Sequence, residues 1–286
     1  MVDLIKLFTP VESLDPEQAK DYVASHEEGT YTLLDVRQPS EYEESHIPGA
    51  KLAPLPQLSD SLNQLDKSKP TLVYCAVGGR SRVAAQLLAG RGFKHVYNLK
   101  GGIKAWLGQT AEGPQDLDLD LIPQEETPEG IFRVSFGMES VLAEFYRSIA
   151  EKSEDSQLAG LLLKLASVEE KHKEYLRDLY RSLTSSATDT ADLESQACVR
   201  MMEGGFEIHE FTRKYEPFLK KREDLLDLSM MLETQALDLY LRFSDKVSDE
   251  KSKQMLFKIA DEEKGHLAAL GRLREETLAS ERQRKG

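Results

Sequence analysis

The chain has 286 residues, a formal net charge of -13 and a pI of about 5.1. This length predicts two domains, and the acidic excess disfavours binding to nucleic-acid phosphates. No run of about 18 apolar residues is present to form a membrane-spanning helix, and the N-terminus does not resemble a signal peptide. The only two cysteines, Cys75 and Cys198, lie far apart, so we expect reduced thiols and a cytoplasmic protein.

Short apolar runs alternate with helical segments in residues 1–109. The runs 31–36, 71–76 and 95–99 are flanked by turn residues, as is typical of buried strands in a parallel sheet. One helix is predicted to begin at Asp15-Pro16, and another spans Ser81 to Gly90. This alternation predicts an α/β domain with a parallel sheet.

Cys75 ends the second of these apolar runs. The segment that follows leads into a predicted helix and contains Ala76, Val77, Gly78, Gly79, Arg80 and Ser81. Backbone N–H groups converge where a strand, a glycine-containing loop and a helix N-terminus meet, so we expect an anion site. A thiolate placed there has a lowered pKa and is nucleophilic, and the arginine adds positive charge. The alternative is an inert, buried cysteine.

Three segments of this domain resemble a known family. They read LLDVRQPSEYEESHIPGA (33–50), LVYCAVGGRS (72–81) and VYNLKGGIKAW (96–106), and together they are similar to a rhodanese-like domain spanning about 5–109. The resemblance implies a sulfurtransferase that takes sulfur from a small-molecule donor, such as thiosulfate or a persulfide, and holds it on Cys75. Asp35 and Arg37 would support the fold or the loop rim, and His46 would be structural. The loop from Cys75 to Arg80 has six residues, one fewer than in related phosphatases, which favours sulfur transfer.

Residues 110–129 are rich in acidic residues, proline and glycine and are predicted to form a linker. The remainder, 130–286, carries apolar residues at helical spacing in the segments 131–152, 156–183, 222–247 and 249–283. A long connection, helical around 192–203 and holding Cys198 as a packing residue, separates the two helix pairs. Two pairs joined by one crossover predict an all-α, ferritin-like four-helix bundle.

The helical half contains a gapless internal repeat with an offset of 94 residues, with nine identities in the 35 aligned positions that begin at Met138 and Leu232. Glutamate and histidine residues are among the identities, and the pairs are Glu139 with Glu233, Glu169 with Glu263, and His172 with His266. Glu and His three residues apart share one face of a helix. A single Glu-x-x-His motif is usually a solvated face, but its repetition predicts that these six residues bind two metal ions.

The segments MESVLAEFYRSIA…VEEKH and LETQALDLYLRF…DEEKGH resemble the two halves of the rubrerythrin group of ferritin-like proteins over about 131–280. The resemblance implies two iron ions per bundle, held by the six residues above, redox chemistry on peroxide or oxygen with an external electron donor, and a homodimer. Manganese or zinc could occupy the same ligands. The chain lacks the Cys-x-x-Cys pairs of a rubredoxin-like module, and it has Ala236 where rubrerythrins tend to carry a further carboxylate. An iron-storing or iron-sensing bundle with a sulfur-carrying interaction module is the alternative, and a catalytically idle N-terminal domain is a third.

Overall fold

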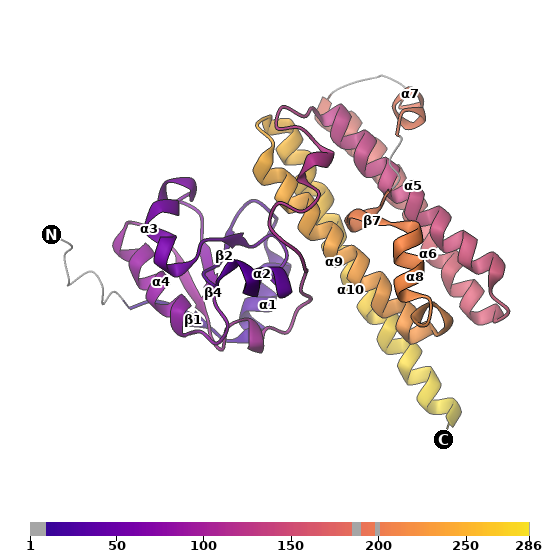
Figure 1. Cartoon of the computed structure of the whole chain (residues 1–286), viewed down its shortest axis with the longest axis horizontal. Coiled ribbons are helices and arrows are strands. Elements are labelled where there is room, and N and C mark those ends of the chain that lie inside the picture. Colours follow the sequence, from indigo (N-terminus) through magenta and orange to yellow (C-terminus); the bar gives the residue numbers. More distant parts are fainter. Residues whose placement is uncertain (1–9, 185–189, 198–200, 286) are drawn as a thin grey trace. The chain divides into compact units, whose positions relative to one another are not determined.

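The computed structural model of the chain describes residues 10–184, 190–197 and 201–285. The chain divides into two units, of which the first ends at Leu117 and the second begins at Asp118, inside the predicted linker (Figure 1). Part of that segment is anchored, because Ile122 is fully buried in the core of the second unit.

A five-stranded parallel sheet forms the centre of the first unit, with strand order β1-β5-β4-β2-β3. The three predicted apolar runs are confirmed as its inner strands, and two short edge strands flank them. The strands are β1 (Glu12–Leu14), β2 (Thr32–Asp35), β3 (Lys51–Leu52), β4 (Thr71–Tyr74) and β5 (Val96–Leu99). The edge strands have only three and two residues and are partly exposed, so they carry no continuous apolar run.

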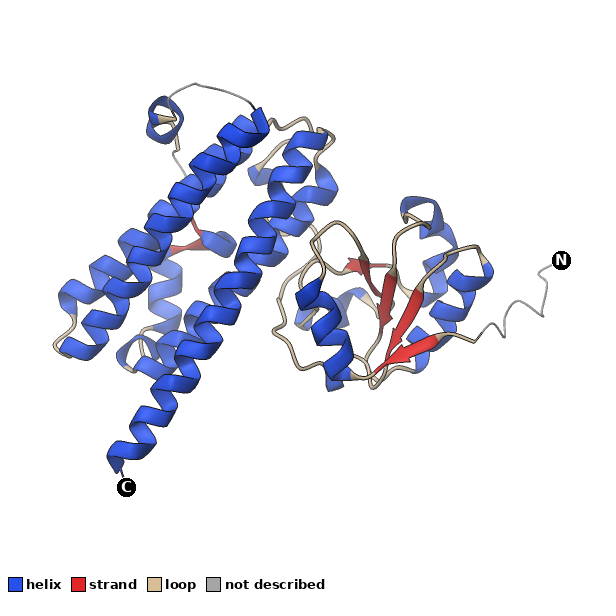
Figure 2. Cartoon of the chain, turned by 180° about the vertical axis from the view of Figure 1, so that it is seen from behind, coloured by secondary structure: helices blue, strands red, loops and turns tan. Residues whose placement is uncertain are grey.

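Helices cover both faces of this sheet (Figure 2). They are α1 (Pro16–Ser25), α2 (Pro39–Glu44), α3 (Leu58–Ser61) and α4 (Gly79–Gly90). Neighbouring residues of a strand point to opposite faces. Leu72 therefore packs in the core that includes residues of α1 and α2, whereas Val73 and Cys75 pack in the core beneath α3 and α4. The predicted start of α1 is confirmed, because Asp15 is its N-cap.

Four long helices dominate the second unit. They are α5 (Pro128–Lys152), α6 (Ser156–Thr184), α9 (Arg222–Lys246) and α10 (Glu250–Lys285), and they match the predicted helical segments to within a few residues. Short turns join α5 to α6 and α9 to α10, and all four helices contribute to two shared apolar cores. No helix among the described residues is both long and apolar enough to cross a membrane.

The connection between the two helix pairs contains α7 (Ala191–Ser195), β6 (Met201–Met202), β7 (Phe206–Glu207) and α8 (Ile208–Tyr215) (Figure 1). The prediction of a helix around 192–203 is wrong beyond Ser195, because β6 and β7 form a small antiparallel hairpin there. Gly204 and Gly205 make its turn with φ angles of 76° and 83°, which other residues rarely adopt. Cys198 lies outside the described residues.

Candidate functional site

Cys75 directly follows β4 and precedes the loop that leads into α4. The cysteine is 1% exposed, whereas Val77 in the loop is 63% exposed. Gly78 is the N-cap of α4 with a φ of 90°, and its N–H points back to the Cys75 Sγ atom at 3.1 Å. The predicted anion loop is therefore formed, with the sulfur at the N-terminus of a helix, where a negative charge is stabilised.

Hydrogen bonds favour the ionised form of this cysteine. Burial raises the pKa of the Cys75 thiol, but the Ser81 hydroxyl and the backbone N–H groups of Ser81, Val77 and Gly78 outweigh burial, and the pKa lies below its ordinary value. The Ser81 Oγ atom lies 3.4 Å from the sulfur. A cysteine with these partners is a better nucleophile near neutral pH than an ordinary buried thiol.

Ser81 is itself positioned by a polar chain that begins at the sheet. Its hydroxyl donates to the Asn98 Oδ1 atom at 2.6 Å, and the Asn98 amide donates to the Ser13 hydroxyl at 3.2 Å. Asn98 is 1% exposed. A hydroxyl has one proton, so Ser81 donates either to Asn98 or to the sulfur, and ionisation of Cys75 favours the second choice.

Glycines of the segment 100–102 support the cysteine loop from behind. Gly102 has a φ of 63°, and a Cβ atom there would lie 2.1 Å from the Cys75 carbonyl oxygen. The Ile103 N–H donates to this same oxygen at 2.8 Å, and the Lys104 N–H donates to the Ala76 carbonyl at 3.2 Å. Only glycine permits this close approach, which fixes the backbone around the sulfur.

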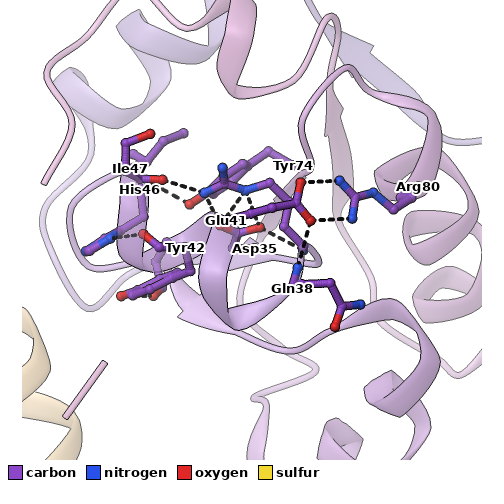
Figure 3. A network of polar contacts seen from close by, with 11 residues as sticks. Asp35, Gln38, Glu41, Tyr42, His46, Ile47, Tyr74 and Arg80 are labelled. Carbon is purple, nitrogen blue, oxygen red and sulfur yellow. Dashed lines mark hydrogen bonds and ion pairs between the residues drawn. The ribbon is translucent and has the colours of Figure 1, made fainter. Parts of the chain in front are cut away.

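Arg80, predicted as a free positive charge at the loop, is paired with Glu41 of α2. The two side chains form a bidentate ion pair with distances of 2.8 and 2.6 Å (Figure 3). The hydrogen bond with Arg80, opposed by partial burial and assisted by the Gln38 N–H, lowers the pKa of Glu41 to about 2. The carboxylate is therefore ionised at any ordinary pH, and sequence reasoning missed it.

Asp35 and Arg37 form a second, buried ion pair behind the first (Figure 3). Their closest atoms are 2.6 Å apart, and the Arg37 guanidinium also donates to the Ser45 carbonyl and lies over the Tyr74 ring. His46 stacks on Tyr42 with ring centroids 3.7 Å apart. These contacts give all three predicted residues structural surroundings.

Six side chains predicted as metal ligands lie in two groups in the helical unit. Each group takes one glutamate from the first helix of a pair and a Glu-x-x-His motif from the second, and the groups are Glu139, Glu169, His172 and Glu233, Glu263, His266. In each group one donor atom per residue lies within 4.8 Å of the other two. The His172 and His266 rings stack at 3.4 Å, so the two groups are adjacent.

All four carboxylates are 1–3% exposed. Burial first, then the charges of Glu233 and Glu139, raise the pKa of Glu169 well above its ordinary value. Burial opposes protonation of His172, but the carboxylates of Glu139 and Glu169 raise its pKa to about 12. Such a concentration of buried negative charge is unfavourable unless cations share it.

The donor set fits two divalent ions in charge and in ligand type. Four carboxylates balance the charge of two divalent cations, and mixed oxygen and imidazole ligands suit iron, manganese or zinc. The Nδ1 atoms face the carboxylates, at 2.8 Å from Glu169 for His172 and at 3.1 Å from Glu263 for His266. The outer nitrogen, Nε2, of His266 lies 3.5 Å from Glu262.

The repeat extends to residues beyond the six ligands. The Tyr146 hydroxyl donates to the Ser229 hydroxyl at 3.1 Å, and both are buried between helices α5 and α9. Tyr240 and Ser135 occupy the equivalent positions at the same offset of 94 residues. The tyrosines therefore have packing and hydrogen-bonding roles between the two helix pairs.

The family profile described as "Rhodanese-like domain" matches residues 18–109. The uncharacterized protein YqhL of Bacillus subtilis is 47% identical over 77 residues, which are 27% of this chain and 61% of that protein, so the chain spans less than two thirds of its length. Thiosulfate sulfurtransferase GlpE of Pseudomonas entomophila is 38% identical over 104 residues, which are 35% of this chain and 92% of that protein. A solved rhodanese-like domain protein from Staphylococcus aureus is 29% identical, with a TM-score of 0.32, over 34% of this chain and 91% of that one.

Three neighbours of the predicted residues were not found from the sequence. Glu41 is recognisable only as the fourth residue of a helix-capping pattern that begins at Gln38. Asn98 lies in an apolar run and has no motif of its own. Glu262 stands where the first repeat has Val168, so the repeat itself gave no signal for it.

Proposed function

Because the chain belongs to the rhodanese-like domain family through its N-terminal unit, we propose that this unit carries sulfane sulfur as a persulfide on Cys75. The observation that supports the proposal most is the set of donors around the sulfur, namely the N–H groups of Val77 and Gly78 and both donors of Ser81. A persulfide is also an anion, so the same donors would stabilise it after transfer.

The transfer follows from this geometry. The Cys75 thiolate attacks the outer sulfur of a donor such as thiosulfate, a new sulfur–sulfur bond forms, and the electron pair of the broken bond leaves with sulfite. The loop N–H groups hold the negative charge before and after this step, and Arg80 stands at the loop with a raised pKa, owing first to Glu41 and also to Cys75. An acceptor thiolate, or cyanide in the assay, then takes the terminal sulfur and regenerates the thiolate.

Thiocyanate production from thiosulfate and cyanide tests this activity. We expect the wild-type chain to turn over and Cys75→Ser to lose essentially all of the activity. A chain whose activity is equal with and without the Cys75 thiol would show that this domain does not transfer sulfur.

For the helical unit we propose a ferritin-like bundle that binds two iron ions through Glu139, Glu169, His172, Glu233, Glu263 and His266. The observation that supports it is the burial of four carboxylates around two stacked imidazoles. When bound, the two ions would supply one-electron redox chemistry toward peroxide or oxygen. The protein's own part would be to fix the ions, exclude water and balance their charge.

Metal analysis of anaerobically purified protein, together with its optical spectrum, tests the metal centre. We expect two ions per chain in the wild type and a clear loss of metal in a Glu139→Ala, Glu233→Ala double variant. Protein that binds no metal after iron is supplied would refute the assignment.

An iron-storing or iron-sensing bundle is a second candidate, and one feature of the sequence favours it. The chain has two cysteines and no Cys-x-x-Cys pair, so it carries no rubredoxin-like module to deliver electrons. Peroxide turnover with a supplied reductant separates the two functions, because a store or sensor would take up iron without sustained turnover.

A further inference from the structure

The mouth of the cysteine loop contains a carboxylate that the sulfur-transfer step does not require. Glu41 lies opposite Arg80 and contacts it through both oxygens (Figure 3). The Arg80 side chain is 37% exposed and that of Glu41 is 33% exposed, so both groups are within reach of an incoming solute. The loop residues 76–79 are uncharged, so Arg80 is the one cation that the loop segment 76–80 supplies.

Glu41 is fixed in this position by its own helix. The Gln38 N–H donates to the Glu41 Oε2 atom at 3.0 Å, as part of the capping box that starts α2. A side chain held at both ends is not free to turn away when a donor arrives. The charges of ionised Cys75, Arg80 and Glu41 therefore sum to minus one at the moment when the donor must approach.

We propose that Glu41 is a specificity-determining residue that makes Cys75 prefer sulfur donors of low negative charge over dianionic donors such as thiosulfate. The inference rests on the proposed sulfur-transfer function of Cys75. A doubly charged donor meets twice the repulsion of a singly charged one, and Arg80 cannot compensate because Glu41 already neutralises it. Donors of the thiosulfonate or organic persulfide class suit such a site better.

A pair of donors that differ in charge measures this preference. Thiosulfate carries two negative charges and leaves as sulfite, whereas methanethiosulfonate carries one and leaves as methanesulfinate. In both reactions the Cys75 thiolate forms the new sulfur–sulfur bond, the leaving group takes the electron pair, and cyanide then removes the terminal sulfur as thiocyanate. The quantity of interest is the ratio of kcat/KM for thiosulfate to kcat/KM for methanethiosulfonate.

We expect Glu41→Gln to raise this ratio about threefold to tenfold, the size of effect produced by removing one partly screened like charge. Glu44→Gln is the matched control, because Glu44 is an exposed residue of the same helix and the substitution changes the net charge equally. The ratio for Glu44→Gln should equal that of the wild type. Potassium chloride should raise the ratio in the wild type and in Glu44→Gln more than in Glu41→Gln, because salt screens the repulsion.

Equal changes in both donors on Glu41→Gln would assign Glu41 a purely structural role and overturn the inference. An identical salt response in all three proteins would overturn it as well, and this measurement does not depend on how well the variant folds. If neither donor gives thiocyanate with the wild type, the proposed sulfur transfer itself fails, which is a separate outcome.

Discussion

Replacing Glu169 with glutamine should have opposite effects on stability in the absence and in the presence of metal. Glu169 is 1% exposed, and the charges of Glu139 and Glu233 add to burial in opposing its ionisation. Without metal, glutamine keeps the shape and removes the unfavourable charge. With metal, glutamine removes one of the carboxylates that balance the ions.

The two effects can be sized. Relief of one poorly compensated buried charge is worth about 1–3 kcal/mol, and roughly 1 kcal/mol shifts the Tm of a unit of this size by about 2–4 °C. The metal-free variant should therefore melt a few degrees above the metal-free wild type. Ligand at a hundredfold excess over its Kd stabilises the wild type by about 2.7 kcal/mol per site, and we expect the variant to lose at least half of this gain.

Thermal unfolding of the full chain measures both quantities, with chelator in one series and anaerobic Fe(II) or Mn(II) in the other. Glu174→Gln is the control, because Glu174 is an exposed residue of the same helix. A Glu169→Gln variant that is less stable than the wild type without metal, or that gains as much stability from metal, would falsify the charge-balance reasoning.

Three further predictions concern the first unit. Ser81→Ala should raise the pKa of Cys75 and slow its alkylation by iodoacetamide about threefold to tenfold at pH 7, with less difference at high pH, where the thiol of both proteins is ionised. Asp35→Asn leaves the buried Arg37 charge poorly compensated and should lower the free energy of unfolding by about 3 kcal/mol in urea titrations, whereas an unchanged midpoint would contradict the buried pair. Gly102→Ala places a methyl group against the Cys75 carbonyl, so both stability and thiocyanate production should fall together.

The fold of both units was largely predictable because its signals are local. Continuous apolar runs predicted the inner strands β2, β4 and β5, and apolar residues at helical spacing predicted the four long helices. The edge strands β1 and β3 were not predicted, because strands of three and two residues lack a continuous apolar run. The connecting segment was predicted as helix as far as residue 203, and its hairpin could not be foreseen since it depends on pairing across two glycines.

The candidate sites divide along the same line. Cys75 and its loop are contiguous in the sequence, so the donors to its sulfur were within the predicted segment. Arg80 was predicted as a positive charge, but its effect depends on Glu41, which lies 39 residues away and reaches it only through the packing of α2 beside α4. A sequence pattern identifies the residues of a loop more readily than it identifies what faces the loop.

The internal repeat predicted six ligands as two equal halves, yet the structure gives the halves unequal surroundings. The His266 Nε2 atom lies 3.5 Å from Glu262, whereas the Nε2 atom of His172 is buried and has no hydrogen-bond partner among the described residues. The difference traces to one position of the repeat, where Val168 replaces the glutamate. A carboxylate behind a ligand histidine orients the ring and strengthens its donor nitrogen. We therefore expect the half formed by Glu233, Glu263 and His266 to hold its ion more tightly, so that symmetry of the ligands does not imply symmetry of binding.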